Sequence, residues 1–295
     1  MEYPSLDTAK AGAIRFNTDS SQMEIYDGNR WTGILATSSE LQTGGTRGLI
    51  MGGIISGRSN VVDYITISTT GDVTEFGDLV QTASQGAGLG SRTRAIAGGG
   101  TPSTPSGTNN IDFHEFASTG NFNDFGDMVT TGFGRNAVAS STRGVFLGRA
   151  VAPNTFNEIE FVTIASEGNA LDFGDLKDTK HTMGAAGNQT RGIAVGGNPS
   201  KDTMNYITIS TTGNAQDFGD CTVDIWNTRG GNCGNAVRGL MAGGGPGSSN
   251  VIQYVTIATL GNTVDFGDRT VAKSQIAHMS STTRACFAGA GEGDD

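Results

Sequence analysis

The chain has 295 residues, a net charge of −10 and 46 glycines, and only 16% of its residues are charged. Glycine is about twice as frequent as the usual ~7%, and helix formers such as Leu, Glu and Lys are scarce, so the composition favours strands and turns. The acidic balance argues against a nucleic-acid partner. The apolar runs are too short to insert in a membrane, and three cysteines without metal spacing argue against a disulfide framework.

The first twenty residues are predicted to form an N-terminal arm or docking segment. Their opening decapeptide, MEYPSLDTAK, lacks the apolar core of a signal peptide. We therefore expect a protein that is made in a cytoplasm and does not use the secretory route. Two short strands are predicted next, at Gln22–Asp27 and Arg30–Leu35.

Two series of residues recur through the rest of the chain at a period of 45–49 residues. The first is an arginine at the start of a short apolar run: Arg47, Arg94, Arg143, Arg191, Arg238 and Arg284. The second is the tetrapeptide acid-Phe-Gly-Asp, centred on Phe76, Phe125, Phe173, Phe218 and Phe266. A fixed period in this range is typical of repeat architectures.

One repeat reads as four short strands. In the first copy these are Arg47–Gly53, Val61–Ser68, Val73–Leu79 and the small-residue run Ala83–Ser91. Apolar and polar residues partly alternate in the second strand, as a half-buried strand requires. That strand also carries a regular aromatic, found at Tyr64, Phe113, Phe161, Tyr206 and Tyr254.

Four strands in 40–50 residues predict the blade of a β-propeller. We expect an all-β, six-bladed propeller over residues 21–295, with antiparallel blades starting near residues 36, 83, 132, 180, 228 and 272. The last repeat lacks the aromatic strand and the Phe-Gly-Asp strand, so residues 21–36 are predicted to complete that blade. Trp31 then takes the place of the motif phenylalanine. A solenoid is the main alternative.

The repeated residues are predicted to be structural. The aromatic series, Trp31 included, is expected to pack between neighbouring blades, and the glycine after each Phe suits a bulge. The acids that follow, Asp78, Asp127, Asp175, Asp220 and Asp268, are expected to accept backbone N–H groups. Each arginine is expected to hold a neighbouring Asp or a turn carbonyl. We expect no cofactor, although Ca²⁺ held by the paired motif acids is an alternative.

We find no catalytic constellation in the sequence, so the chain is not expected to be an enzyme. His181 and His278 could approach a central channel, but solvated or structural roles are favoured. Variable loops lie between the glycine pair of the arginine strand and the aromatic strand of each repeat, and loops on a rigid scaffold commonly bind partners. The candidate binding residues in them are Thr101, Pro105, Asn109, Phe156, Lys201 and Ser248.

Two resemblances accompany this reading. The glycine pairs and the late aromatic strand of each unit resemble kelch-type propellers, most closely in MEIYDGNRWTGI, although Phe-Gly-Asp stands where kelch repeats have Trp. Residues 9–34, AKAGAIRFNTDSSQMEIYDGNRWTGI, resemble a segment common in tail-fibre and other virion structural proteins of phages, especially marine cyanophages.

The second resemblance implies a non-enzymatic virion protein: a tail-fibre or baseplate module, or a capsid decoration. Its partners would be other virion proteins and a host-surface glycan or protein; its oligomeric state is left open. Two alternatives remain, a carbohydrate-binding or carbohydrate-active propeller and a kelch-like adaptor.

Overall fold

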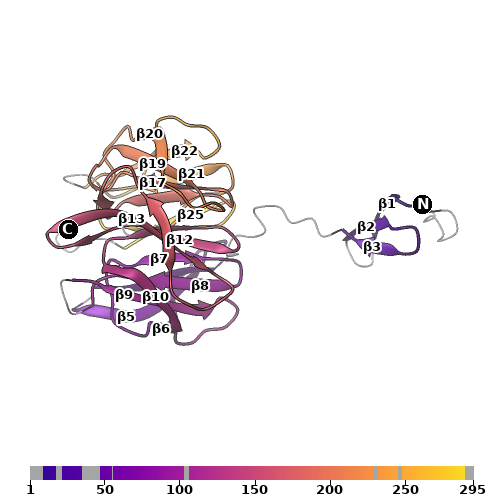
Figure 1. Ribbon diagram of the computed structural model, residues 1–295, viewed down its shortest axis with the longest axis horizontal. Coiled ribbons are helices and arrows are strands. Elements are labelled where there is room, and N and C mark those ends of the chain that lie inside the picture. The colour runs from indigo at the N-terminus through magenta and orange to yellow at the C-terminus, as the bar shows by residue number, and fades with distance from the viewer. Residues whose placement is uncertain are drawn as a thin grey trace. The chain divides into compact units, whose positions relative to one another are not determined.

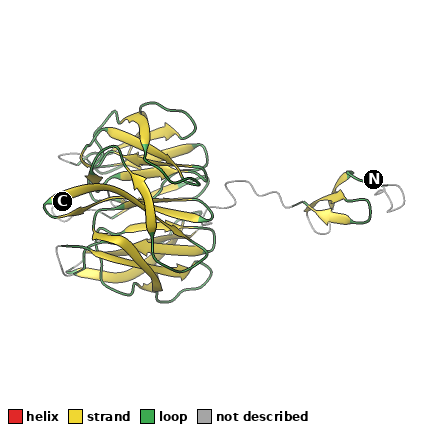
Figure 2. Ribbon diagram, in the orientation of Figure 1, coloured by secondary structure: helices red, strands yellow, loops and turns green. Residues whose placement is uncertain are grey.

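The computed structural model describes residues 9–17, 22–34, 47–54, 56–102, 106–228, 231–244 and 248–289. In these residues every regular element is a β-strand (Figures 1 and 2). The chain divides into two compact units, Met1–Ser38 and Ser39–Asp295. The all-β prediction is confirmed.

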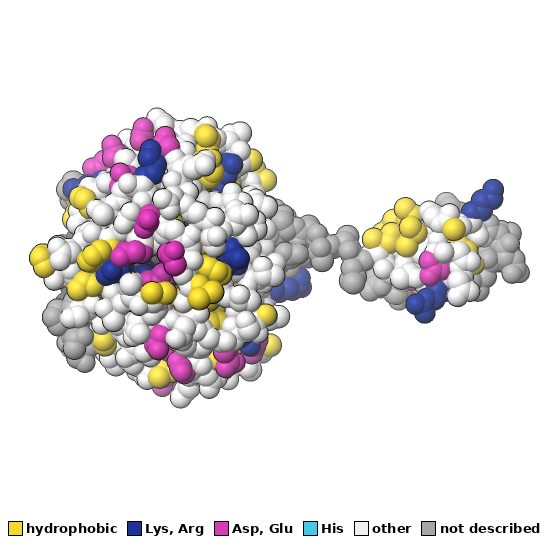
Figure 3. All heavy atoms as spheres, viewed as in Figure 1, with side chains coloured by type: hydrophobic (Ala, Val, Ile, Leu, Met, Phe, Trp, Pro, Cys, Tyr) yellow, Lys and Arg dark blue, Asp and Glu magenta, His cyan; other side chains and the backbone are white. Residues whose placement is uncertain are grey.

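The smaller unit is one antiparallel sheet of β1 (Ile14–Asn17), β2 (Gln22–Tyr26) and β3 (Trp31–Gly33). β1 and β3 pair with the two edges of β2. One face is apolar and exposed, with Ile14 paired to Ile25 and Phe16 paired to Met23; Figure 3 shows hydrophobic side chains gathered on this unit.

The opposite face of the smaller unit is held by Arg15. Its Nε lies 2.8 Å from Glu24 Oε2, and its guanidinium lies 4.3 Å from the centre of the Trp31 ring. This sheet therefore has one polar, internally bonded face and one apolar face.

In its described residues the larger unit contains six main antiparallel sheets, which we number in chain order, and one short two-stranded pair. The first is β4 (Arg47–Ile54), β5 (Arg58–Thr66) and β6 (Thr74–Asp78). The second is β7 (Ala87–Gly90), β8 (Arg94–Gly98), β9 (Thr108–Glu115) and β10 (Asn123–Gly132). The third is β11 (Asn136–Ala139), β12 (Arg143–Val151), β13 (Asn154–Thr163) and β14 (Leu171–Asp175).

The later sheets follow the same plan. The fourth is β16 (Gly184–Gly187), β17 (Arg191–Val195), β19 (Thr203–Thr208) and β20 (Gln216–Asp220), and a short pair, β15 (Lys180–His181) with β18 (Asn198–Pro199), accompanies it. The fifth is β21 (Arg238–Ala242), β22 (Val251–Thr256) and β23 (Val264–Asp268). The sixth is β24 (Ala277–Ser280) with β25 (Ala285–Ala288).

The hydrophobic core of the larger unit lies between successive sheets. One cluster joins Val145 and Phe173 of the third sheet to Ala185 and Ile207 of the fourth, and equivalent clusters join the second sheet to the third and the fourth to the fifth. The sixth sheet returns to the first, because β24 contacts β4 and Arg284 Nη1 donates to Ile67 O at 3.0 Å.

Two predictions about the N-terminus require correction. Residues 21–36 were expected to complete the last sheet, but β2 pairs with β1 on one edge and with β3 on the other, while β24 pairs with β25 in a two-stranded sheet. The boundary expected near residue 20 lies instead after Ser38. The physical reason is local: β1 and β2 are neighbours in sequence, and closing so short a loop is entropically easier than pairing with strands some 250 residues away.

The predicted start near residue 36 lies outside the described residues. The strands β7, β11, β16 and β24 begin four or five residues after the starts predicted near 83, 132, 180 and 272. In the fifth sheet an isolated bridge between Gly234 and Gly239 stands in place of that first strand.

Candidate functional site

Five of the six repeated arginines stack on the regular aromatic of the next strand in their own sheet. The guanidinium carbons of Arg47, Arg94, Arg143, Arg191 and Arg238 lie 4.3–4.6 Å from those ring centres. The same aromatics meet the motif phenylalanines edge to face at 5.7–6.2 Å. Arginine, aromatic and phenylalanine therefore form one stack in each of the first five sheets.

The same arginines also bind the next sheet. Nη1 of Arg94 donates to Ile164 O at 2.9 Å, and Arg191 Nη1 donates to Ile257 O at 2.7 Å. Arg47 and Arg143 make the equivalent bonds, to Phe116 O and Ile209 O. Of the two predicted acceptors, a neighbouring Asp and a turn carbonyl, the structure shows the carbonyl. In the described part of the chain no ion pair joins a repeated arginine to a motif acid.

The motif phenylalanines of the first four sheets are buried by the following sheet. Phe76, Phe125, Phe173 and Phe218 are each 2% exposed. Phe218, for example, packs in a cluster with Val255 and Ile257 of the fifth sheet. Phe266 of the fifth sheet is 53% exposed, and Trp31 lies in the smaller unit.

The backbone around each phenylalanine is hydrogen-bonded to the next sheet. Gly168 N donates to Phe125 O at 2.8 Å and Ala170 N to Asp127 O at 2.8 Å. A Cβ on Gly126, which has φ of +143°, would lie 2.6 Å from the carbonyl carbon of Gly168. Glycine is required there because only a bare backbone fits this approach.

The motif aspartates act through their backbone rather than through the carboxylates predicted to accept N–H groups. Asp127 N donates to Asn169 Oδ1 at 3.1 Å, and Asp78, Asp175 and Asp220 do the same with Asn121, Asn214 and Asn262. Asp268 has no such bond among the described residues. The glycine and asparagine of each turn therefore hold the outer strand of the preceding sheet.

A further set of residues joining the sheets was missed at the sequence level. Asp112, Glu160, Asn205 and Gln253 each accept a backbone N–H from the preceding sheet, as Glu160 Oε2 does from Val129 N at 2.9 Å. Their position could have been found in the sequence, since each of them immediately precedes the regular aromatic of its repeat.

Two buried arginines distinguish the third sheet. The Arg135 side chain is fully buried, 3.4 Å from Glu160 Oε1, and Arg149 Nη2 lies 2.9 Å from Glu158 Oε1. Arg135 also donates to Thr130 O at 2.7 Å. Burial lowers the pKa of Arg135, while Glu160 acts in the opposite direction. Both arginines lie outside the repeat register, so the period gave no sign of them.

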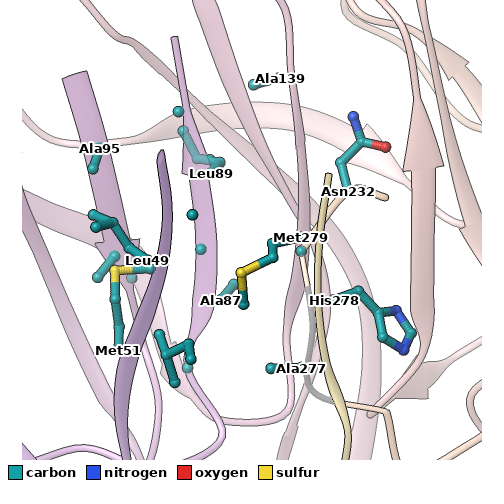
Figure 4. Close-up of a pocket in the computed structure, with 18 of the residues that line it drawn as sticks. Leu49, Met51, Ala87, Leu89, Ala95, Ala139, Asn232, Ala277, His278 and Met279 are labelled. Carbon is teal, nitrogen blue, oxygen red and sulfur yellow. The ribbon is translucent and has the colours of Figure 1, made fainter. Parts of the chain in front are cut away.

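A cavity of about 630 Å³ lies between the first strands of the sheets. Its wall includes residues of the first, second, third, fourth and sixth sheets and the segment 231–236 before the fifth, and Figure 4 shows Leu49, Leu89 and Met279 directed into it. Amide and hydroxyl side chains also line it: Gln85, Asn110, Gln189, Asn232, Asn235 and Ser280. This volume lies within the ~300–1,000 Å³ range of small-molecule sites.

Two titratable groups on the cavity wall have shifted pKa values. Burial lowers the pKa of His278 to about 4, and its Nε2 lies 3.2 Å from Ala242 O. Burial raises the pKa of Asp112 to about 6. His278 is among the residues that line the cavity, although Figure 4 shows its ring on the opposite side of its strand from Met279.

The candidate loop residues do not form one cluster. Thr101 is buried, bridged to Ser84, Phe156 lies 3.7 Å under the Arg149 guanidinium, and Lys201 Nζ lies 4.8 Å from the centre of the Trp226 ring. Asn109 belongs to β9 and Ser248 is half-buried. Pro105 lies outside the described residues. Phe156 and Lys201 thus each take part in a contact between a cation and an aromatic ring.

Within the described residues, no three His, Cys, Asp or Glu side chains are grouped so that they could hold a metal ion. The same residues include no helix suited to crossing a membrane. Comparison of the sequence with protein-family models finds no match, and no curated protein matches it.

Proposed function

We propose that this chain is a non-enzymatic structural protein of a phage virion that docks on other virion proteins and contacts a host surface. We further propose that the six sheets of the larger unit are the blades of a propeller. The bond from Arg284 to Ile67, which joins the last sheet to the first, supports the propeller.

The observation that carries the docking role is the smaller unit. The segment that resembles phage fibre proteins folds as its own three-stranded sheet. Ile14 is 59% exposed, Phe16 52% and Met23 44% on one face. Exposed apolar side chains gathered on one face are typical of protein–protein interaction sites, so this face suits contact with another protein.

The test is the location of the protein. We expect peptides of this chain in purified virions, and we expect the double variant Phe16→Asp, Ile25→Asp to be missing from particles assembled in its presence. Asn29→Asp, in the exposed turn of the same unit, is the matched control and should be incorporated normally. A chain that is absent from particles would overturn the proposal.

A carbohydrate-binding role is the second candidate. The cavity lined by amides and hydroxyls, together with the Lys201–Trp226 pair, offers the neutral hydrogen-bonding groups and the aromatic ring that sugars use. A glycan array separates this role from simple docking: saturable binding that Trp226→Ala abolishes would support it, and an array with no signal would exclude it.

A further inference from the structure

The interfaces on either side of the second sheet share one plan and differ in the side chains at their centre. Between the second and third sheets, Phe146 of β12 pairs across the strands with Glu160 of β13, and Arg135 Nη2 lies 3.4 Å from Glu160 Oε1. All three residues are buried. An aromatic ring and an ion pair therefore fill this interface.

The interface between the first and second sheets has smaller residues at the equivalent positions. Ala97 of β8 pairs with Asp112 of β9, and Gly86 stands directly before β7 where Arg135 stands directly before β11. The ring and the guanidinium are thus missing here, while the carboxylate is kept. Ala97 is only half-buried, because the space beside it is not filled.

The carboxylate of Asp112 is buried without a counter-charge. Asp112 is 5% exposed; its Oδ2 accepts the N–H of Val80 at 3.1 Å, and its Oδ1 has no hydrogen-bond partner among the described residues. Within those residues no Lys, Arg or His forms an ion pair with it. Burial raises the pKa of Asp112 to about 6. A buried charge is costly unless it is paired, so this position favours a cation.

The central cavity reaches this carboxylate. Its wall includes Asp112, Ala97 and Gly86, together with Ser84. Ser84 is 4% exposed, and its Oγ has no hydrogen-bond partner in the described chain. The apolar part of the wall that comes from the same two sheets includes Leu49, Met51, Ala87 and Leu89 (Figure 4). One cavity therefore combines two unpartnered oxygens with an apolar surface.

We infer that this part of the cavity binds a small organic cation that carries a guanidinium or primary ammonium group on an aliphatic chain. The charged group would lie against the Asp112 carboxylate and Ser84 Oγ, and the aliphatic chain would lie along Met51 and Leu89. Hydrogen bonds between such a cation and a carboxylate are among the strong ones. The ligand thus has the chemistry of Arg135, which the protein itself supplies at the neighbouring interface.

Two other classes of ligand fit this carboxylate less well. A neutral ligand would leave Asp112 without a counter-charge. A Ca²⁺ ion takes about six to eight oxygens, and among the described residues Asp112 belongs to no group of three side chains that could hold a metal ion. One carboxylate beside an apolar wall therefore selects an organic cation, and a cavity of about 630 Å³ has room for one.

The test uses the full chain alone, because the inference does not depend on the proposed virion role. The probe is n-hexylguanidinium, titrated by isothermal calorimetry above pH 7, where Asp112 is ionised; n-hexylurea is its uncharged counterpart of similar shape. We expect saturable binding of hexylguanidinium, at least tenfold tighter than that of hexylurea. Nuclear Overhauser contacts from the hexyl chain to the methyl groups of Met51 and Leu89 should locate the ligand.

Two variants and a matched control assign the binding to this site. Asp112→Asn should weaken hexylguanidinium binding at least tenfold, and we expect it to fold because Asn205 occupies the equivalent position in the fourth sheet. Ala97→Phe, which gives this interface the ring of Phe146, should abolish binding. Asp127→Asn removes an exposed acid of the same sheet, and its binding should stay within twofold of the unmodified chain.

Three outcomes overturn the inference. The first is the absence of saturable binding, and the second is binding that Asp112→Asn does not weaken. The third concerns Arg229, the only lysine or arginine of the chain outside the described residues. If hexylguanidinium binds only to the variant Arg229→Gln, the chain's own arginine is the partner of Asp112 and no ligand is required.

Discussion

The fourth and fifth sheets contain the same stack of residues and differ in what lies beside it. Tyr206 meets Phe218 at 6.1 Å and Tyr254 meets Phe266 at 6.2 Å, both edge to face. Phe218 is nevertheless 2% exposed and Phe266 53%. The geometry within a sheet is therefore the same whether or not a neighbour is present.

The comparison shows where the motif acquires its stabilising effect. A phenylalanine contributes by removing apolar area from water, at roughly 25 cal/mol per Å². In the fourth sheet that removal comes from Val255 and Ile257 of the next sheet. The repeat is thus a device for joining sheets, and it contributes little at an interface that is open.

The largest expected difference is between the phenylalanines themselves. Phe173→Ala, at a filled interface, should lower the free energy of unfolding by ~3–5 kcal/mol because it leaves a cavity. Phe266→Ala should lower it by less than ~1 kcal/mol, because an exposed side chain has little burial to lose. Urea denaturation of the two variants measures both. Equal losses would contradict the comparison.

The second difference concerns charge at the interface between the second and third sheets. Glu160→Gln keeps an oxygen for the N–H of Val129 but leaves the buried Arg135 without its carboxylate partner. We expect a loss of about 3 kcal/mol in unfolding free energy. The natural neutral residues at the equivalent positions, Asn205 and Gln253, have no such arginine beside them.

The control for this prediction is the double variant Glu160→Gln, Arg135→Met. Removing both charges should recover most of the loss, because a buried pair replaced by apolar packing is often near neutral. A double variant as unstable as the single one would place the effect in the hydrogen bonds to Thr130 and Val129 instead.

The third prediction separates the inner and outer halves of the interface between the fifth and sixth sheets. The inner half is closed: His278 Nε2 lies 3.2 Å from Ala242 O, and Ser280 Oγ donates to Gly234 O at 2.8 Å. The pKa of His278 is lowered from 6.5 to about 4 by burial. Its contribution to stability is present above pH 6.5 and is lost as the pH falls towards 4, by up to about 3 kcal/mol.

Asp112 acts with the opposite sign in the same pH range. Its pKa is raised from 3.8 to about 6, so its contribution is present below pH 3.8 and lost as the pH rises through 6. The measurement is therefore the pH dependence of unfolding in an Asp112→Asn background, with and without His278→Gln. We expect His278→Gln to flatten the acid slope, and an unchanged slope would show that His278 is not buried.

The fourth difference compares two arginines. Arg191→Met should lower the unfolding free energy by ~1–2 kcal/mol, since it leaves the Ile257 carbonyl without its donor. Arg238→Met should change it by less than ~0.5 kcal/mol, because within the described residues this exposed arginine meets no carbonyl and loses mainly its contact with Tyr254. Thermal unfolding of both variants gives the comparison, and a large loss at Arg238 would mean that its interface is filled.

Much of this architecture was predictable because the repeat displays it several times. The alternation in the aromatic strand predicts β5, and the run of small residues predicts β7, each within a few residues of its observed range. The burial of Phe76 and its equivalents follows from the same period. Local pattern is sufficient where one repeat resembles the next.

The sequence could not predict which of several distant residues a given side chain or strand would pair with. Arg143 meets a carbonyl 66 residues away rather than a motif acid, and that choice depends on the register between two sheets. In the sequence, Glu158 and Glu160 of the third sheet look like the ordinary polar positions of an alternating strand. Their role is clear only from the structure, which places Arg149 and Arg135 beside them. Trp31 matched the phenylalanine spacing, but spacing cannot show that β1 is the nearer partner of β2.

The smallest expected effect tests that last point. Deletion of residues 1–38 removes three strands whose pairings are all with one another. The free energy of unfolding of the remaining chain should therefore change by less than ~0.5 kcal/mol, the range of changes that remove no buried contact. A loss of several kcal/mol, together with faster hydrogen exchange at Ala285–Ala288, would contradict this expectation and indicate that Gln22–Gly33 pairs with β25. The variant Trp31→Ala in the full chain distinguishes the two outcomes without truncation, because it should affect stability only if that ring packs where Phe76 and its equivalents do.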